Sequence, residues 1–337
     1  MQIKAQIAGN SQTIAKICNA ELRDFSHQTP IHELIRGSLS CIAFNPGYTL
    51  TTKGHYMEPA LNQIRDQQRQ TWDKFSTGWK KWDDKIMQWI APVGNELIRN
   101  AALTSTSQLL DIAAGTGEPG LTAASHVPKG NVTVTDLSDQ MLAFAAENAH
   151  SRGIKNFATR QCDVSAMPFA DKQFDAITCR FGFMFFPDIA ISLNEMIRVA
   201  KPGARISSAI WCAPEKNPWA TTIMSTIAAH VEMPAISPGA PGLFRCAPAK
   251  FMSDAYRVAG LKNIVEKEIS GELAFNSPEE YWNMMTDIAA PVVAGLAKAD
   301  AVTHDKIKKT VQELAAKTAT DGGARFRWSA LAVCGEK

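Results

Sequence analysis

The 337-residue sequence lacks any apolar run approaching the ~20 residues that a membrane-spanning helix needs. It also lacks the N-terminal apolar stretch and cleavage pattern of a secretory signal. Three acidic residues, Glu21, Asp24 and Glu33, make the first segment a poor mitochondrial transit peptide. We therefore expect no integral membrane segment and a cytoplasmic location.

Closely spaced cysteine pairs and a strong net charge are also missing. None of the seven cysteines stands in a Cys-x-x-Cys pair, which argues against a zinc site or a disulfide framework and favours a reduced compartment. The formal net charge is +2, and no basic segment interleaved with aromatic residues stands out. We expect neither a bound metal nor a nucleic-acid partner.

The N-terminal third divides into two parts. Residues 1–56 carry no motif, so we predict an extension of unknown role, and Met57 is a candidate alternative start. Residues 57–105 form a predicted helical segment. Its apolar residues recur at three- and four-residue steps, which predicts one aromatic helix face: Trp72, Phe75, Trp79, Trp82, Ile86 and Trp89. That face is expected to pack on the next domain; alternatively, one aromatic residue also covers a ligand.

From residue 107 to residue 212, strand and helix patterns alternate. Strands are expected at 108–112, 131–135, 156–161, 173–178 and 204–211, with helices near 117–126, 138–152 and 189–200. This alternation predicts a doubly wound α/β fold with parallel strands. Two more strands are expected at 263–270 and 325–334.

Two insertions interrupt the predicted domain of residues 106–337. The first, 213–250, carries six prolines around an apolar helix near 218–232, and a further helix is expected near 248–259. The second, 278–320, is largely helical. Long insertions in a compact domain are usually functional, so we expect helical caps over the strand ends.

The most informative stretch is Leu-Leu-Asp111-Ile-Ala-Ala-Gly115-Thr-Gly117-Glu-Pro-Gly120-Leu. A strand, a glycine loop and a helix start in this order let the backbone approach a ligand closely. The three glycines match the dinucleotide pattern G-x-G-x-x-G, which by itself is weak evidence. The carboxylate of Asp111 argues against it, because it repels a pyrophosphate and attracts an ammonium group. On this interpretation the third glycine, Gly120, is incidental.

Two further acids end the next two predicted strands. Val-Thr-Val-Thr-Asp136 suits a carboxylate that accepts hydrogen bonds from ribose hydroxyls, and Leu137 and Met141 follow as candidates to flank a purine ring. Gln-Cys-Asp163 suits an acceptor for an adenine amino group. Since parallel strands end at one sheet edge, these acids and Asp111 are expected to line one site.

With these motifs, and with Phe-Asp-Ala-Ile-Thr-Cys-Arg180-Phe-Gly182 and Arg-Val-Ala-Lys201-Pro-Gly after them, the chain resembles the class I S-adenosylmethionine-dependent methyltransferases. Within that class it looks most like the group containing the ubiquinone and menaquinone biosynthesis C-methyltransferases. The specific motifs cover about residues 70–212. The family's first loop glycine is Ala113 here.

The resemblance implies a Rossmann-like sheet of seven strands, mostly parallel with the last antiparallel, flanked by a helical N-terminal extension and helical caps. It implies S-adenosylmethionine as the cofactor. The residues implied to bind it are Asp111, Ala113, Gly115, Gly117, Asp136, Leu137, Met141, Asp163, Val164, Arg180 and Phe181.

The catalytic residues are harder to predict, because the cofactor supplies the electrophile and the protein supplies alignment. His230, in the first insertion, is the best candidate base, and Arg180 or Arg245 are candidates to orient an anionic or enolic substrate. The apolar insertions favour a small, largely apolar or aromatic acceptor such as a quinol or phenol. Two alternative functions remain open, a cofactor-binding sensor or scaffold without methyl transfer and an oxidoreductase. A homodimer is also possible.

Overall fold

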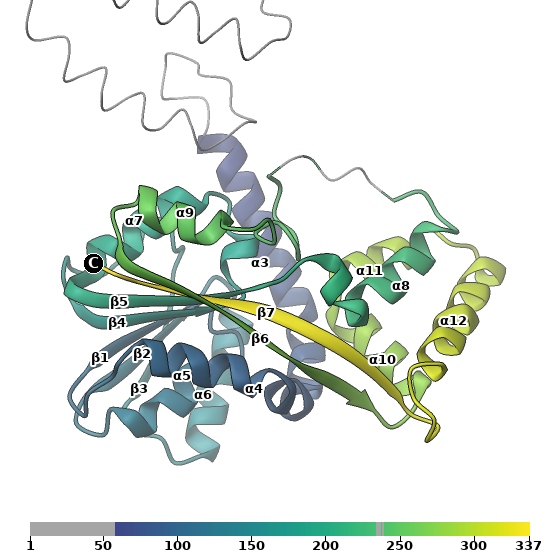
Figure 1. The fold of residues 1–337 in the computed structure, drawn as a ribbon, viewed down its shortest axis with the longest axis horizontal. Helices are drawn as coiled ribbons and strands as arrows, with labels where there is room; N and C mark the ends of the chain where they lie inside the picture. The colour runs from purple at the N-terminus through teal and green to yellow at the C-terminus, as the bar shows by residue number, and fades with distance from the viewer. Residues whose placement is uncertain (1–57, 234–236, 238) are drawn as a thin grey trace, which may run out of the picture. The chain divides into compact units, whose positions relative to one another are not determined.

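The computed structural model describes residues 58–233, 237 and 239–337, so the expectations for residues 1–56 and Met57 lie outside the described part (Figure 1). Its centre is one seven-stranded sheet in the order β3-β2-β1-β4-β5-β7-β6. The strands are β1 (Gln108–Ile112), β2 (Asn131–Asp136), β3 (Phe157–Gln161), β4 (Phe174–Arg180), β5 (Ala200–Trp211), β6 (Lys262–Phe275) and β7 (Ala324–Glu336). β1 to β5 are parallel, and β7 runs antiparallel to both β5 and β6. This confirms the predicted mostly parallel sheet with an antiparallel last strand.

The strand order places β1 at the point where the chain switches direction across the sheet. β1 pairs with β2 on one side and with β4 on the other, and Asp111 stands level with Val134 and Thr178. Because the crevice outside the carboxyl ends of such strands is where α/β sheets bind ligands, the glycine loop after β1 lies at the expected position.

Helices cover both faces of the sheet (Figure 1). α4 (Asp83–Asn100), α5 (Gly120–Ala123) and α6 (Asp139–Ser151) lie on one face, while α7 (Ile189–Val199) and α9 (Phe251–Val258) lie on the other. The helix predicted at 117–126 is only the single turn of α5 and the 3-10 turn η1 (Ala124–His126). The loop occupies the rest, because Gly117 has φ +113° and cannot join a helix.

The aromatic segment predicted over 58–101 forms two helices, α3 (Glu58–Lys81) and α4, which separate at Trp82. Ile86 and Trp89 are buried in the core, as expected for a packing face, whereas Trp72 and Trp79 on α3 are half-buried. Trp89 contacts three other tryptophans across the end of the sheet, namely Trp211, Trp219 and Trp328.

The two insertions contribute helices beside the long antiparallel pair of strands β6 and β7 (Figure 1). They are α8 (Pro218–Ala228), preceded by η3 (Pro214–Lys216), and α10 (Pro278–Ile288), α11 (Ala290–Leu296) and α12 (Ala301–Ala316). α10 packs closely on α3, since a Cβ on Gly78 would lie 2.1 Å from the carbonyl oxygen of Asp287. Lys81 and Trp82 donate to the Asp287 carboxylate at 2.6 and 2.8 Å, so the second insertion is joined to the N-terminal helices.

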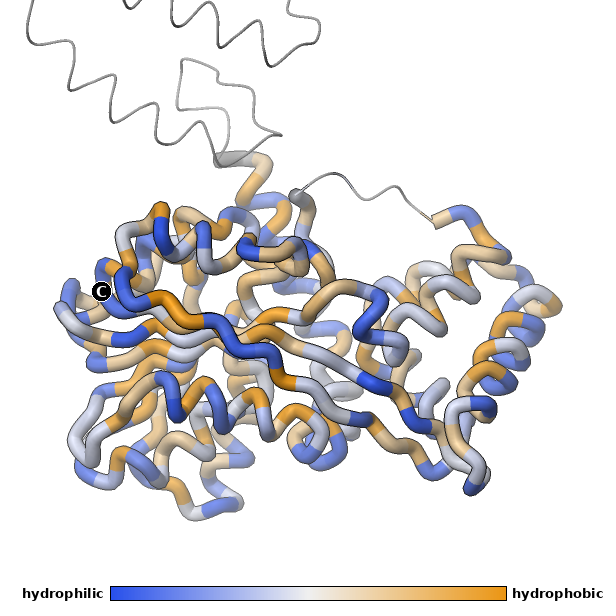
Figure 2. The backbone as a smooth tube through the Cα atoms, viewed as in Figure 1, coloured by the Kyte–Doolittle hydropathy of each residue, from blue (hydrophilic) through white to orange (hydrophobic). Residues whose placement is uncertain are grey.

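β6 forms an edge of the sheet, and short hydrophobic and hydrophilic stretches follow one another along it (Figure 2). Buried and exposed positions alternate at its end, where Leu273 and Phe275 are buried. None of the helices in the described ranges is long and apolar enough to cross a membrane.

Candidate functional site

The loop between β1 and α5 holds three residues with positive φ: Ala113 at +55°, Gly115 at +56° and Gly117 at +113°. A Cβ on Gly115 would meet nothing within 4 Å, so the backbone here faces open space. Ala113 has the left-handed conformation that glycine adopts without strain, which explains physically why the resembling family places glycine at this position. The loop therefore presents an open backbone cradle.

Gly120 corrects the expectation that the third glycine is incidental. A Cβ there would lie 2.7 Å from a methyl carbon of Val134 and 3.0 Å from Asp111 Oδ2. The Gly120 amide donates to that same carboxylate oxygen at 2.9 Å. Gly120 thus lets the start of α5 pack directly on the sheet.

Asp111 is fully buried beneath the loop. Its Oδ2 accepts from the Gly120 amide, and its Oδ1 accepts from Thr178 Oγ1 at 2.7 Å. Burial raises its pKa to about 7, although Thr178, Arg180 and the Gly120 amide favour the charged form. Asp111 therefore fixes the loop to β1 and β4, and its carboxyl group is buried beneath the loop.

Asp136, at the end of β2, is the second acid that the sequence places at the edge. It accepts from the Gly115 amide at 2.9 Å and from the Ser138 amide at 2.9 Å, so it links the glycine loop to the start of α6. Burial raises its pKa. Leu137 is half-buried beside it, whereas Met141 is only 2% exposed. Of the two candidates to flank a purine ring, Leu137 is the more accessible.

Asp163 follows β3 and is half-buried, next to the buried Val164. Its Oδ1 accepts from the Ser165 amide at 2.8 Å, and its Oδ2 lies 3.6 Å from Arg65 Nη1. Arg65 belongs to α3, so this helix reaches the third acid of the edge.

α3 makes further polar contacts along the same edge. Asp73 accepts from Ser138 Oγ at 2.6 Å, and Ser138 in turn accepts from the Met141 amide and caps α6. Lys80 donates to Asn148 Oδ1 at 2.6 Å. Sequence reasoning missed these residues, although Asp73 and Lys80 stand seven residues apart, which is about two turns and places them on one face of α3.

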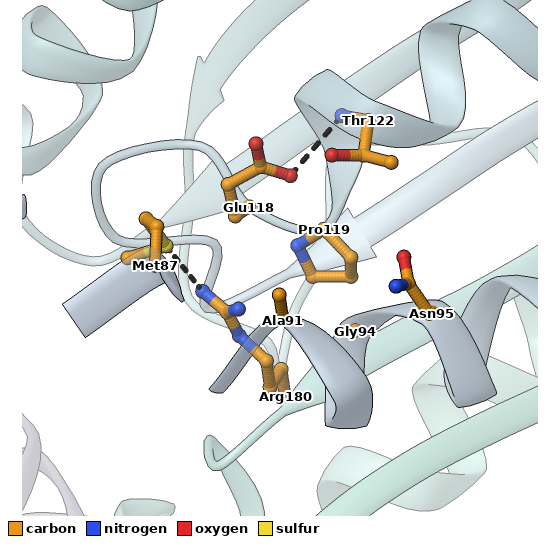
Figure 3. Close-up of a pocket in the computed structure, with 8 residues that line it drawn as sticks. All are labelled: Met87, Ala91, Gly94, Asn95, Glu118, Pro119, Thr122 and Arg180. Atoms are coloured by element: carbon orange, nitrogen blue, oxygen red, sulfur yellow. Dashed lines mark hydrogen bonds between the residues drawn. The ribbon is translucent and has the colours of Figure 1, made fainter. Parts of the chain in front are cut away.

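A cavity of about 50 Å³ lies between α4, the end of the glycine loop and Arg180 (Figure 3). Its lining residues are Met87, Ala91, Gly94, Asn95, Glu118, Pro119, Thr122 and Arg180. Among the described residues, the one hydrogen-bond acceptor of the Arg180 guanidinium is Met87 Sδ, at 3.2 Å. Burial lowers the pKa of Arg180, while Glu118, Asp111 and Asp83 act in the opposite direction. A guanidinium with five donors and a thioether acceptor has capacity for an anion.

Glu118 supplies the opposite charge in this cavity. It is 9% exposed and accepts from the Thr122 amide at 3.1 Å and from Arg152. Each carboxylate oxygen can accept a second hydrogen bond. The cavity is therefore lined by a cation, Arg180, and by an anion, Glu118, whose carboxylate also forms an ion pair with Arg152. Glu118 was not predicted to have a role.

A buried network anchors the loop from behind. Thr116 Oγ1 donates to Asp83 Oδ1 at 2.6 Å, and Asn148 Nδ2 donates to Asp83 Oδ2 and to the Thr116 carbonyl, each at 2.9 Å. The loop is thus held from the first turn of α4 and from α6.

Phe181 follows Arg180 with φ +64° and stacks on Trp211 at 4.2 Å between centroids, with 12° between the ring planes. The next residue, Gly182, packs on Ala113, since its Cβ would lie 2.8 Å from Ala113 Cβ. The loops after β1 and β4 therefore touch, and Phe181 lies at the carboxyl edge.

No contact among the described residues brings His230 to this edge. Its Nδ1 lies 2.9 Å from the carbonyl of Thr226 in α8, which ends two residues before it. Arg245 donates to the backbone carbonyls of Phe186 and Pro187, so it supports the segment after η2 (Phe183–Phe185). The described ranges also hold no cluster of three or more potential metal ligands among His, Cys, Asp and Glu.

Comparison with known proteins places the same stretch in a defined group. A family model described as "Methyltransferase domain" matches residues 109–203. A demethylmenaquinone methyltransferase of Porphyromonas gingivalis is 30% identical over 177 residues, which cover 52% of this chain and 68% of that protein. A second, from Thermus thermophilus, is 38% identical over 99 residues, covering 29% of this chain and 44% of that protein. The crystal structure of the YcgJ protein from Bacillus subtilis superposes with a TM-score of 0.49 and 19% identity, over 72% of this chain and 97% of that one.

Proposed function

The chain belongs to the class I S-adenosylmethionine-dependent methyltransferases, and we propose that it methylates an oxygen or carbon nucleophile of a small, largely apolar or aromatic metabolite of the quinol or phenol type. The observation that carries the placement of the cofactor is the cavity between α4 and the glycine loop. There Arg180 and Glu118 present opposite charges at the end of the glycine loop.

The residues present fit the amino-acid end of S-adenosylmethionine. That end carries a carboxylate and an ammonium group, and a guanidinium beside a carboxylate complements both. Arg180 is assigned to the carboxylate and Glu118 to the ammonium, with Asp111 adding negative charge from below. This revises the sequence prediction, in which Asp111 and the loop backbone alone held the methionine part.

The nucleoside end is assigned to the ends of β2 and β3. Asp136 is proposed to accept from the ribose hydroxyls, since each of its oxygens holds one backbone amide and has a further lone pair. Leu137 is proposed to flank the adenine ring, and Asp163 and the Val164 amide to contact its polar edge. Met141 is buried, so Leu137 is the candidate that we retain for the ring.

When bound, S-adenosylmethionine supplies a methyl group on a positively charged sulfur, so the chain's own contribution is alignment and exclusion of water. The touching loops after β1 and β4 fix where the methyl donor and the acceptor meet. Phe181 is half-buried and stacks on the buried Trp211, so the ring of Phe181 is the aromatic group offered there. We assign no general base, because no contact among the described residues brings His230 to this edge.

The half-buried ring of Phe181 supports the proposed acceptor class, because an aromatic ring favours a flat apolar partner. The activity named for two similar proteins, demethylmenaquinone methyltransferase, supports it independently. The cap role of the two insertions is part of the same proposal, with α10 fixed to α3 through Asp287. Cytoplasmic location and homodimerisation remain predictions from the sequence.

The direct test is transfer of an isotope-labelled methyl group from S-adenosylmethionine to a panel of quinols, phenols and amines. We expect label in a quinol or phenol product. Cofactor binding without transfer to any member of the panel would favour a sensor or scaffold instead. Tighter binding of a nicotinamide dinucleotide than of S-adenosylhomocysteine would contradict the methyltransferase assignment.

A further inference from the structure

Trp79 on α3 has a buried indole Nε1 without a hydrogen-bond partner. Buried indole N–H groups usually find an acceptor, and two others in this chain do. Trp82 Nε1 donates to Asp287 at 2.8 Å, and Trp219 Nε1 donates to Asn217 Oδ1 at 3.0 Å. The indole of Trp79 therefore has a donor to offer.

Two other tryptophans share this feature but lie deeper. Trp89 is 8% exposed inside the tryptophan cluster of the core. Trp328 is 2% exposed and covers Gly271 of the neighbouring strand, where a Cβ would lie 2.8 Å from its ring. Trp79 differs because its side chain is half-buried and lies on the helix that follows the carboxyl edge.

The surroundings of Trp79 join this helix to the loop after β4. Its ring lies 6.0 Å from that of Trp72 at 60°, and the Trp72 ring lies 5.2 Å from that of Phe185 at 83°. Phe185 ends the short turn η2, three residues after Gly182, which packs on the glycine loop. α3 is held there by the contact of Asp73 with Ser138. Two ring contacts therefore connect an aromatic group with one unused donor to the loop after β4, beside which the acceptor is proposed to bind.

We propose that Trp79 determines which acceptor is methylated, by donating its Nε1–H to an oxygen atom on an aromatic ring that packs against Trp72 and Phe185. This inference rests on the proposed methyltransferase function. An indole nitrogen donates and does not accept, so it selects a carbonyl, hydroxyl or phenolate oxygen. The indole N–H forms no hydrogen bond with a hydrocarbon ring, and it repels an ammonium group. Leaving such a buried donor unpaired disfavours an acceptor that lacks the oxygen.

The test compares two flat probes, 1,4-naphthalenediol kept reduced with dithiothreitol, and naphthalene, on the full chain saturated with S-adenosylhomocysteine. The wild type is expected to bind the diol more tightly. Trp79→Phe, which keeps an aromatic ring and removes the donor, is expected to weaken diol binding by about 2- to 12-fold, the equivalent of one neutral hydrogen bond. Binding of naphthalene and of S-adenosylhomocysteine should stay unchanged.

Trp79→His retains a ring N–H and is expected to recover part of the preference for the diol. Trp282→Phe, on α10, serves as the matched control and should preserve it. Equal affinities of Trp79→Phe and the wild type for the diol, or an equal loss for both probes, would overturn the proposal. An equal loss for both probes would mean that Trp79 acts in packing, or that its Nε1–H donates to a bound water.

A spectroscopic measurement on the wild type covers the case in which Trp79→Phe fails to fold. In nitrogen-15-labelled protein, the diol but not naphthalene should move one indole N–H resonance downfield, and no such movement would refute the inference. Absence of methyl transfer to every quinol and phenol tested would instead contradict the proposed function, so the two failures are distinguishable.

Discussion

The methyl group of Ala113 lies against the Cα of Gly182, so that a Cβ built on Gly182 would stand 2.8 Å from Ala113 Cβ. The contact joins the loops that follow β1 and β4, between which the methyl donor and its acceptor are proposed to meet. Ala113 also carries a positive φ of +55°, which costs an alanine about 1–2 kcal/mol relative to the right-handed conformation.

Ala113→Gly is therefore expected to raise the free energy of unfolding by ~0.5–1 kcal/mol, since the relief of strain exceeds the added freedom of the unfolded chain. Gly182→Ala is expected to lower it by ~1–3 kcal/mol, because its Cβ would also approach Cys179 and Phe186 closely. Urea denaturation of both single variants and the double variant measures their coupling. Ala102, with φ +48°, is a matched control.

In this cycle Ala102→Gly should stabilise the protein without any coupling to Gly182→Ala. The double variant with Ala113→Gly should lose less stability than the two single effects predict. Strict additivity at both alanines would show that the two loops do not share this contact.

The pKa of Asp111 gives stability a pH dependence. Burial raises it from 3.8 to about 7, so the folded protein keeps a proton that the unfolded chain releases. The contribution of this group to stability is therefore full below about pH 4, the ordinary aspartate pKa. It declines as the pH rises through about 7. Asp111→Asn should remove this fall, so its unfolding free energy should depend less on pH between 5 and 8 than that of the wild type.

Denaturation curves at several pH values test this, with Asp139→Asn, at an exposed position in the first turn of α6, as control. Parallel pH profiles of the wild type and Asp111→Asn would be inconsistent with a protonated buried carboxyl group. Cofactor binding adds positive charge above Asp111, so it should also release a proton at pH 6, detectable by calorimetry in buffers of different ionisation enthalpy.

Substitutions at Asp163 and at Arg65 distinguish a role in ligand binding from a role in holding α3 at the sheet edge. Asp163→Ala is expected to weaken binding of S-adenosylhomocysteine by about 10-fold, through loss of a hydrogen bond to a charged acceptor. Arg65→Ala should leave affinity equal or slightly higher and shift stability by less than ~1 kcal/mol, because the pair is partly exposed. Unchanged calorimetric affinity in Asp163→Ala would remove this acid from the adenine site.

Much of the fold followed from the sequence, because strand alternation and strand-end acids are local patterns. The seven strands, their parallel run and the placement of Asp111, Asp136 and Asp163 at one edge were all predicted. The short extent of α5 was not predicted. The positive φ of Gly117 extends the loop over residues for which the periodicity indicates a helix.

The side-chain partners at the site were not predictable in the same way. Asp111 was interpreted as facing a ligand, but Thr178 and the Gly120 amide, distant in sequence, take its oxygens. Glu118 and Arg65 gained their roles only through helix packing. The position of His230 in an insertion favours a catalytic role, yet its ring lies against the carbonyl of Thr226 in the preceding helix. Long-range packing decides such cases, and single-sequence patterns do not encode it.

The central claim is that the cavity lined by Arg180 and Glu118 receives the amino-acid end of the cofactor. Calorimetry with S-adenosylhomocysteine and with 5′-methylthioadenosine, which lacks that end, tests it in the wild type, in Arg180→Met and in the exposed control Arg257→Met. We predict that Arg180→Met weakens S-adenosylhomocysteine binding by about 10- to 100-fold, as expected for a charge-assisted hydrogen bond, and leaves methylthioadenosine binding unchanged. An equal loss for both ligands, or no loss for either, would contradict the account.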